Sequence, residues 1–191
     1  MTKYFKQLVL LFLCAAIFAP PAVVSASKLP SSMVTIGEGD DFFEPQIELN
    51  IGDKAPDFSL PNLATDQMES LKDFLGKPVI LFFIQSACHS CLQEAKALQQ
   101  LYTKYEGKIN VVAVGVDLLG KPMLVTWAAH NNISYPVLLD PIFSVPEKYG
   151  FSFTPSSVVI DQQGNIAMVH AGYRPQDIDM FEAKIKELLA K

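Results

Sequence analysis

Residues 78–91 read PVILFFIQSACHSC, and this stretch decides the fold. Residues 78–85 form a continuous apolar run rich in β-branched and aromatic side chains, which predicts a strand buried on both faces. From residue 90 to residue 105 the apolar side chains follow a helical spacing, and Gly107 then acts as a stop. The side chains of this stripe are Leu92, Ala95, Leu98, Leu101 and Tyr102. Cys88 and Cys91 therefore lie where a buried strand ends and a helix begins.

The rest of the chain alternates between strand-like and helix-like patterns. The further predicted strands cover residues 57–60, 109–116, 157–160 and 166–171, with a short apolar piece at 137–139. The further predicted helical segments cover residues 71–75, 123–131, 143–149 and 176–190. Buried strands joined by helices predict an α/β fold with a central mixed β-sheet and helices on both faces. The last two strands flank a glycine-containing turn and form an antiparallel hairpin at the sheet's edge.

Length and charge limit the classes of function. The chain has 191 residues, half of them hydrophobic, and a formal net charge of −5. This length suits one compact domain with its own core and is too short for two large ones. The acidic balance leaves no basic stripe to neutralise phosphates, so we expect no nucleic-acid partner.

The N-terminus has the layout of a secretory signal peptide. Lys3 and Lys6 precede an apolar run at residues 8–19, two prolines follow, and residues 24–26 are small enough for cleavage. We predict that residues 1–26 are a signal peptide, with an uncleaved membrane anchor as the alternative. The run itself is shorter than the roughly 20 residues of a spanning helix. Either reading predicts a periplasmic or other extracytoplasmic protein, secreted or held at the membrane.

Residues 27–52 are predicted to form an N-terminal extension, and residues 53–191 the folded domain. The extension holds Gly37, Gly39, Pro30, Pro45 and a short acidic patch. The patch consists of Glu38, Asp40, Asp41 and Glu44. Because its spacing does not match a calcium loop, we interpret it as a solvated loop or a short edge strand.

Cysteine use points to redox chemistry. Cys14 lies inside the signal segment, so the mature chain keeps only Cys88 and Cys91, in a compartment where disulfides persist. A disulfide across two intervening residues closes a very small loop and stabilises the fold little. Zinc would need two more ligands, and the mature chain offers no third cysteine and only scattered histidines, so we expect no metal.

The position of the pair explains how it would react. Unpaired N–H groups and the positive end of the helix dipole stabilise a thiolate on Cys88, and a protonated His89 would add to this. The three-residue spacing brings Cys91 to the same helix face. We therefore expect Cys88 to be the exposed nucleophile and Cys91 the more buried resolving thiol. No cofactor is needed beyond the redox-active disulfide between them.

Four motifs together resemble the thioredoxin-like proteins of the TlpA and redoxin type, which are related to AhpC/TSA proteins. They are GDKAPDFSLP at 52–61, FFIQSACHSCLQE at 82–94, YPVLLDP at 135–141 and FTPSSVVIDQQGNI at 153–166. The resemblance covers roughly residues 50–190. It implies a thioredoxin-like fold and an exported thiol–disulfide oxidoreductase that reduces disulfides of other exported proteins. It also implies protein thiol or disulfide substrates and a membrane or periplasmic redox donor.

The resemblance assigns roles to further residues. Pro155 would be a cis-proline facing the disulfide, and the Thr154 backbone would pair with a bound substrate strand. Ser90 completes the dipeptide between the two cysteines. Glu94, three residues after Cys91, matches a position common in exported relatives, where it would either handle a proton or be a solvated helix residue.

Three positions depart from the family pattern. Ala87 replaces the usual tryptophan before the first cysteine, Phe82 replaces a buried aspartate, and Lys96 stands where a helix-kinking proline is common. Without the aspartate, no obvious carboxylate remains on the strand to take the proton of the resolving thiol. His89 stabilises the thiolate and so raises the reduction potential, whereas the resemblance favours a reductase. The direction of electron flow stays open.

Two other functions compete with disulfide exchange. A peroxiredoxin-like peroxidase is suggested by the motif at 52–61, but Gln85 and Leu81 occupy the positions where that chemistry needs Thr or Ser and Pro. A copper-binding assembly factor would need a third ligand such as His170. Remaining polar residues have structural explanations: His130 ends a predicted helix, and Asp117 ends a predicted strand, where it caps a loop or faces a ligand.

Overall fold

The computed structural model describes residues 49–191. The predicted signal peptide and most of the predicted extension lie outside the described residues. No helix within residues 49–191 is long and apolar enough to cross a membrane.

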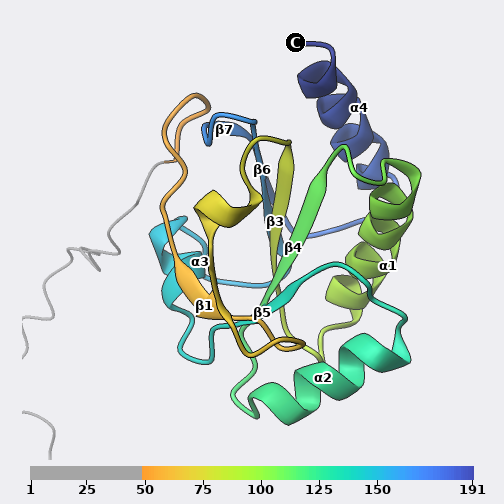
Figure 1. The fold of residues 1–191 in the computed structure, drawn as a ribbon. Coiled ribbons are helices and arrows are strands. Elements are labelled where there is room, and N and C mark those ends of the chain that lie inside the picture. The colour runs from red at the N-terminus through yellow and green to blue at the C-terminus, as the bar shows by residue number, and fades with distance from the viewer. Residues whose placement is uncertain (1–48) are drawn as a thin grey trace, which may run out of the picture. The chain divides into compact units, whose positions relative to one another are not determined.

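A five-stranded mixed sheet forms the centre of the molecule (Figure 1). Its strands in spatial order are β5 (Val137–Leu139), β4 (Asn110–Gly115), β3 (Val79–Ile84), β6 (Ser156–Ile160) and β7 (Ile166–Ala171). Strands β3, β4 and β5 run parallel, whereas β6 and β7 are antiparallel to their neighbours. The predicted α/β fold with a mixed sheet and an antiparallel edge is confirmed.

Strand β3 is buried on both faces, which explains its unbroken apolar sequence. Successive side chains of a strand point to opposite faces. Ile80, Phe82 and Ile84 accordingly pack into one hydrophobic cluster. Val79, Leu81 and Phe83 pack into the other.

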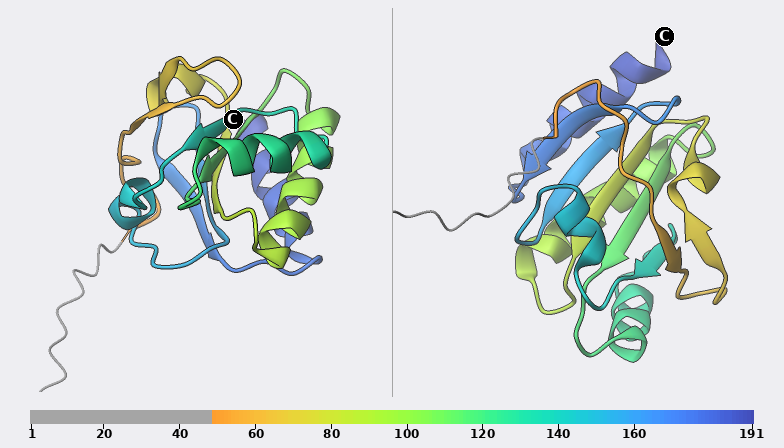
Figure 2. Two further views of the ribbon diagram at one scale, coloured as in Figure 1. Left: turned by 90° about the horizontal axis from the view of Figure 1, so that it is seen from below. Right: turned by 90° about the vertical axis from the view of Figure 1, so that its left-hand side faces the viewer.

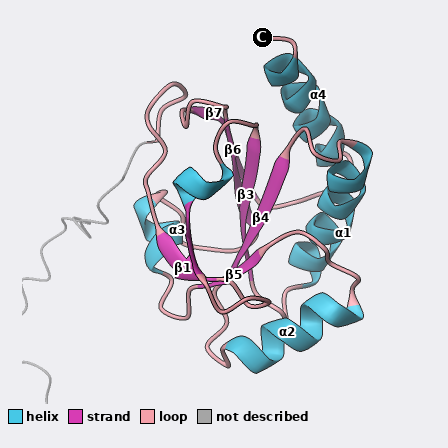
Figure 3. Ribbon diagram, viewed as in Figure 1, coloured by secondary structure: helices cyan, strands magenta, loops and turns pink. Residues whose placement is uncertain are grey.

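Helical elements cover both faces of the sheet (Figures 1 and 3). The cluster on one face contains side chains of α1 (His89–Lys104), α2 (Lys121–His130) and α4 (Asp177–Leu189). The cluster on the other face contains side chains of the 3-10 helix η2 (Leu71–Phe74) and of α3 (Ser144–Lys148). The right-hand view of Figure 2 shows α3 in front of the sheet and α4 behind it. All the helical segments predicted from the sequence are present within two residues of their predicted starts.

One small sheet was not fully predicted. β1 (Ser59–Pro61) pairs antiparallel with β2 (Met68–Ser70) beside η2. The strand predicted at 57–60 is thus shifted, and that at 68–70 was missed. Three residues are too few to show an alternation of period two, so only the pairing with β1 defines β2.

Candidate active site

Cys88 and Cys91 form a disulfide at the junction of β3 and α1. Their Cα atoms are 5.2 Å apart. Cys88 is the residue that caps the N-terminus of α1 and is partly exposed, whereas Cys91 lies in the first helical turn and is fully buried. Of the two sulfur atoms, that of Cys88 is therefore the one an incoming partner can reach.

The sulfur of Cys88 takes the place of an oxygen in a helix cap. The backbone N–H of Cys91 donates to Cys88 Sγ over 3.1 Å, and the Ser90 hydroxyl lies 3.4 Å from the same sulfur. An N-terminal N–H and the helix dipole both favour negative charge at this position. In the reduced protein the same groups stabilise a thiolate on Cys88.

His89 stands on the exposed side of the first turn of α1. Its Nε2 atom lies 3.2 Å from the side-chain nitrogen of Gln93, one turn further along the helix. The imidazole therefore lies at the surface. In the sequence, His89 directly follows Cys88, the more exposed of the two cysteines.

Asp117 holds the turn that leads into the cysteines. Its carboxylate accepts hydrogen bonds from the Ser86 backbone N–H over 2.7 Å and from the Ser86 hydroxyl over 2.9 Å. The Asp117 side chain is buried, at 8% exposure. Its carboxylate thus caps the turn after the neighbouring strand β3, in agreement with the loop-capping interpretation of this residue.

Replacing Asp117 by Asn should therefore destabilise the oxidised protein. An amide has one acceptor oxygen, and its NH₂ group cannot accept the second Ser86 donor, so we expect the free energy of unfolding to fall by about 1–3 kcal/mol. Urea denaturation measures this loss. Asp66→Asn is the control: it removes an exposed carboxylate paired with Lys121 and should cost less than about 1 kcal/mol. Equal losses in the two variants would contradict the anchoring role.

Thr154 and Pro155 lie beside this turn and are joined by a cis peptide bond, as the resemblance implied. Ser156 pairs with Phe83 across the sheet, which places Pro155 near the carboxyl end of β3. The Thr154 hydroxyl donates to Gln85 Oε1 over 3.4 Å, and the Gly172 N–H donates to the Pro155 carbonyl over 2.8 Å. The segment before β6 is thus tied to the residues just before the cysteines.

Glu94 is not a solvated helix residue, and that part of the sequence interpretation is wrong. Its side chain is fully buried, on the helix face that packs against the sheet. The Ser157 hydroxyl on β6 donates to Glu94 Oε1, whereas Oε2 has no hydrogen-bond partner within residues 49–191. Because Glu94 follows Cys91 by three residues, the two side chains share one face of α1.

Burial changes the acidity of Glu94. The pKa of this carboxyl is raised from 4.5 to about 8, mainly because burial removes its solvation. The Ser157 hydrogen bond opposes this rise, and the negative charge of Asp177 contributes to it. The carboxyl is therefore largely protonated at neutral pH while the disulfide is intact. Phe82 pairs with Ser157 in register, so a carboxyl group does reach the sheet face where the aspartate of the family pattern is missing.

Two of the residues around the site were not singled out from the sequence. Ser157 was seen only as part of a strand, and Tyr135, whose hydroxyl donates to the Ala95 carbonyl over 3.1 Å, only as part of a motif. The sequence did contain a signal that Glu94 is buried. Cys91, Glu94, Ala95 and Leu98 follow the i, i+3, i+4, i+7 spacing of a buried helix face.

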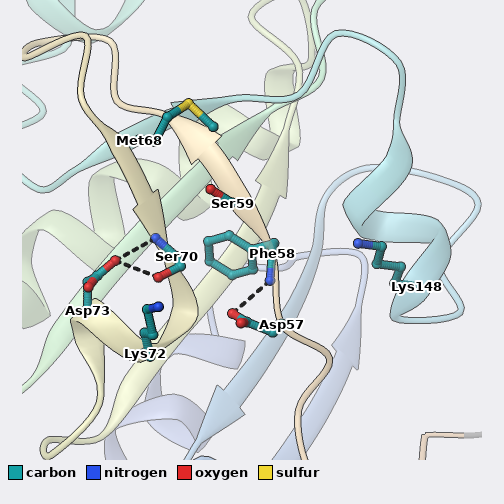
Figure 4. A pocket seen from close by; sticks show the side chains of 8 residues that line it. All are labelled: Asp57, Phe58, Ser59, Met68, Ser70, Lys72, Asp73 and Lys148. Carbon is teal, nitrogen blue, oxygen red and sulfur yellow. Dashed lines mark hydrogen bonds between the residues drawn. The ribbon is translucent and has the colours of Figure 1, made fainter.

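A surface pocket beside β1, β2 and η2 contains no residue of the cysteine turn (Figure 4). Its lining residues are Asp57, Phe58, Ser59, Met68, Ser70, Lys72, Asp73 and Lys148. Asp73 Oδ2 accepts from both the backbone N–H and the hydroxyl of Ser70, and Asp57 accepts from the Phe58 N–H. The two carboxylates of the pocket thus accept hydrogen bonds from residues close to them in the sequence, and we assign no chemistry to this pocket.

The histidines away from the cysteines have structural surroundings. His130 ends α2 at the surface, and His170 on β7 lies 3.1 Å from Asp177 and packs edge-on against Phe181. Among residues 49–191, no group of three or more His, Cys, Asp or Glu side chains is placed to hold a metal ion.

Comparison with known proteins identifies the family. The AhpC/TSA family pattern matches residues 51–169, well over half of the chain. The chain belongs to the AhpC/TSA family. The match includes the disulfide, the cis-proline and all five strands of the central sheet up to residue 169 of β7.

Relatives of this AhpC/TSA protein are named as thioredoxin-like or thiol–disulfide exchange proteins. The thioredoxin-like protein YneN of Bacillus subtilis is 30% identical over 69% of this chain and 77% of its own length. The thiol-disulfide oxidoreductase ResA of Bacillus thuringiensis is 28% identical over 85% of this chain and 83% of its own. A crystal structure assigned as the thiol:disulfide interchange protein DsbE of Chlorobium tepidum is 34% identical, with a TM-score of 0.70, over 74% of this chain and 99% of that one.

These comparisons confirm the predicted fold and class of enzyme. The AhpC/TSA protein has a thioredoxin-like fold and is a thiol–disulfide oxidoreductase of the ResA and DsbE type.

Proposed function

We propose that the enzyme works by dithiol–disulfide exchange through Cys88 and Cys91, and that it reduces disulfides of exported proteins. One observation supports this most directly: a disulfide joins a partly exposed cysteine at a helix N-terminus to a fully buried one. This arrangement separates an attacking sulfur from a resolving one, which two-step exchange requires.

In the proposed reaction the Cys88 thiolate attacks one sulfur of the partner's disulfide. A mixed disulfide forms, and the partner's other sulfur leaves as a thiolate that takes up a proton. The Cys91 thiol then loses its proton and attacks Cys88 Sγ, which releases the partner's second thiol. Two electrons pass to the partner, and the Cys88–Cys91 disulfide remains for a thiol donor to reduce.

Glu94 is proposed to exchange the proton of Cys91. As a carboxylate it accepts the proton when Cys91 attacks, and as a neutral acid it returns the proton when the disulfide opens. A pKa raised to about 8 by burial suits both directions near neutral pH. In the proposal Thr154 and Pro155 bind the partner's backbone beside the disulfide, and His89 and Ser90 stabilise the Cys88 thiolate.

The proposed location is outside the cytoplasm. The basic and apolar pattern of residues 1–26 supports export. In this proposal the segment is either cleaved as a signal peptide or retained as a membrane anchor. In such a compartment the enzyme needs a membrane or periplasmic redox donor, and its partners are proteins that carry thiols or disulfides.

Reduction of insulin disulfides with a thiol donor tests the reaction, and peroxide consumption with the same donor is measured beside it. We expect insulin to be reduced and peroxide to be consumed at the uncatalysed rate. Rapid peroxide turnover would contradict the proposed exchange reaction and support a peroxidase instead. Stoichiometric Cu(I) binding without insulin reduction would instead support a copper-binding factor.

The reduction potential of the Cys88–Cys91 pair tests the direction of electron flow. For a reductase we expect a value below about −220 mV, whereas strong oxidants lie near about −120 mV. Equilibration with glutathione or dithiothreitol buffers gives the value. A potential near the upper figure would contradict the reductase and leave the exchange reaction itself intact.

A further inference from the structure

The buried carboxyl of Glu94 belongs to a polar cluster that reaches the protein surface. Ser157, whose hydroxyl donates to Glu94, pairs in register with His170 on the neighbouring strand β7. Residues directly opposite each other in a sheet point to the same face, so His170 lies on the side of the sheet that Glu94 occupies. The cluster thus extends from the core below α1 to the end of β7.

His170 connects this cluster to the start of α4. Its Nε2 atom is 3.1 Å from Asp177 Oδ2, and the Arg174 N–H donates to the same oxygen over 2.7 Å. Both side chains of the pair are largely buried, with 17% and 11% exposure. The ring of His170 also packs edge-on against Phe181. Asp177 is therefore held in place by His170 and by the Arg174 N–H, and Phe181 packs against the ring of His170.

The Asp177 carboxylate acts on Glu94 through space. Two negative charges in a poorly solvated region repel each other, so Asp177 favours the neutral form of Glu94. The other polar and titratable groups around Glu94 are Cys91 on the same helix and, from other parts of the chain, Tyr135, Ser157, His170 and Tyr173. None of these side chains carries a permanent charge, which leaves Asp177 as the main charge acting on Glu94 among residues 49–191.

We propose that Asp177, held by His170, is a positioning residue that controls the protonation of Glu94 and so the pH range in which Cys91 can give up its proton. The inference rests on the proposed role of Glu94 in the exchange reaction. It assigns a function to a His–Asp pair that joins β7 to the start of α4, outside the Cys88–Cys91 motif.

The titration of Glu94 in the oxidised protein tests whether Asp177 controls the protonation of Glu94. The carbon-13 resonance of its carboxyl group is followed with pH in the wild-type protein and in Asp177→Asn. Asn retains an oxygen that accepts from the Arg174 N–H but carries no charge, so we expect the acid dissociation constant of Glu94 to rise about 3- to 10-fold. Asp179→Asn is the matched control, because it removes an exposed carboxylate from the same helical turn.

His170→Phe gives an independent variant with the opposite expectation. Phe retains the ring packing against Phe181 but removes the nitrogen that faces Asp177, which leaves the carboxylate less compensated. We expect the acid dissociation constant of Glu94 to fall. A shift in the same direction as Asp177→Asn, or no shift in either variant, would overturn the inference.

The pH dependence of the exchange reaction tests whether this control sets the pH range in which Cys91 can give up its proton. The rate at which Cys91 resolves the mixed disulfide should reach half its maximum at a lower pH in Asp177→Asn than in Asp179→Asn. In a Glu94→Gln background the Asp177 substitution should have no such effect. If Glu94→Gln itself leaves the pH profile unchanged, the proposed role of Glu94 fails. If Glu94→Gln changes the pH profile but Asp177→Asn and Asp179→Asn give the same profile, the inference about Asp177 fails and the proposed role of Glu94 stands.

Discussion

Replacing Cys88 by Ser is expected to lower the rate of disulfide exchange to the uncatalysed background, a loss of about 10³-fold or more. Cys88 Sγ is the more exposed sulfur, and it accepts the backbone N–H of Cys91 in the first turn of α1. A serine hydroxyl at the same place is not ionised at neutral pH and cannot attack a disulfide. Insulin reduction and reaction with a chromogenic disulfide both measure the loss.

Cys91→Ser should behave differently, although it also stops turnover. Cys88 can still attack, but no second thiol is present to release the partner, so a mixed disulfide should accumulate in about one equivalent per protein. Mass spectrometry without reducing agent detects it. Cys14→Ser is the control with unchanged activity, because Cys14 is the only other cysteine in the sequence. Accumulation of the mixed disulfide in Cys88→Ser rather than in Cys91→Ser would reverse the proposed roles.

Glu94→Gln is expected to remove a pH dependence of stability. The pKa of Glu94 is about 8 in the folded oxidised protein, against 4.5 when the carboxyl is solvated. Between these pH values the folded state holds one proton more than the unfolded state, so raising the pH favours unfolding. Each pH unit in this window should cost the wild-type protein about 1.4 kcal/mol of unfolding free energy from this group. Below pH 4.5 the group contributes no further change.

Urea denaturation of the oxidised proteins at pH 5, 6, 7 and 8 tests this expectation. The difference in stability between wild type and Glu94→Gln should grow in favour of Gln as the pH rises. Glu182→Gln is the control, since hydrogen bonds from Lys104, Lys186 and Tyr105 lower the pKa of that carboxyl to about 2. The stability that Glu182 contributes is lost only below pH 4.5, so its replacement should leave the slope from pH 5 to 8 unchanged. Parallel profiles for wild type and Glu94→Gln would contradict the buried, protonated carboxyl.

Local patterns predicted most of the fold. The apolar run of β3 and the helical spacing after it depend on side chains within one element, and both persist in the structure. The shifted bounds of β1 and the missed strand β2 arise where no such pattern exists within one element. In that pair the partner strand, rather than a periodicity of its own, defines a three-residue strand.

The sequence by itself determined the thioredoxin-like order of elements, and it placed two cysteines at the junction of a buried strand and a helix. Only the tertiary structure decided which polar groups surround them. Glu94 is buried because α1 packs against β3 and β6, Ser157 faces it from another strand, and Asp177 comes from the far end of the chain. Periodicity along a chain shows which face of a helix is apolar. The acidity of a carboxyl depends instead on the solvent it loses and on charges brought near it by residues distant in sequence.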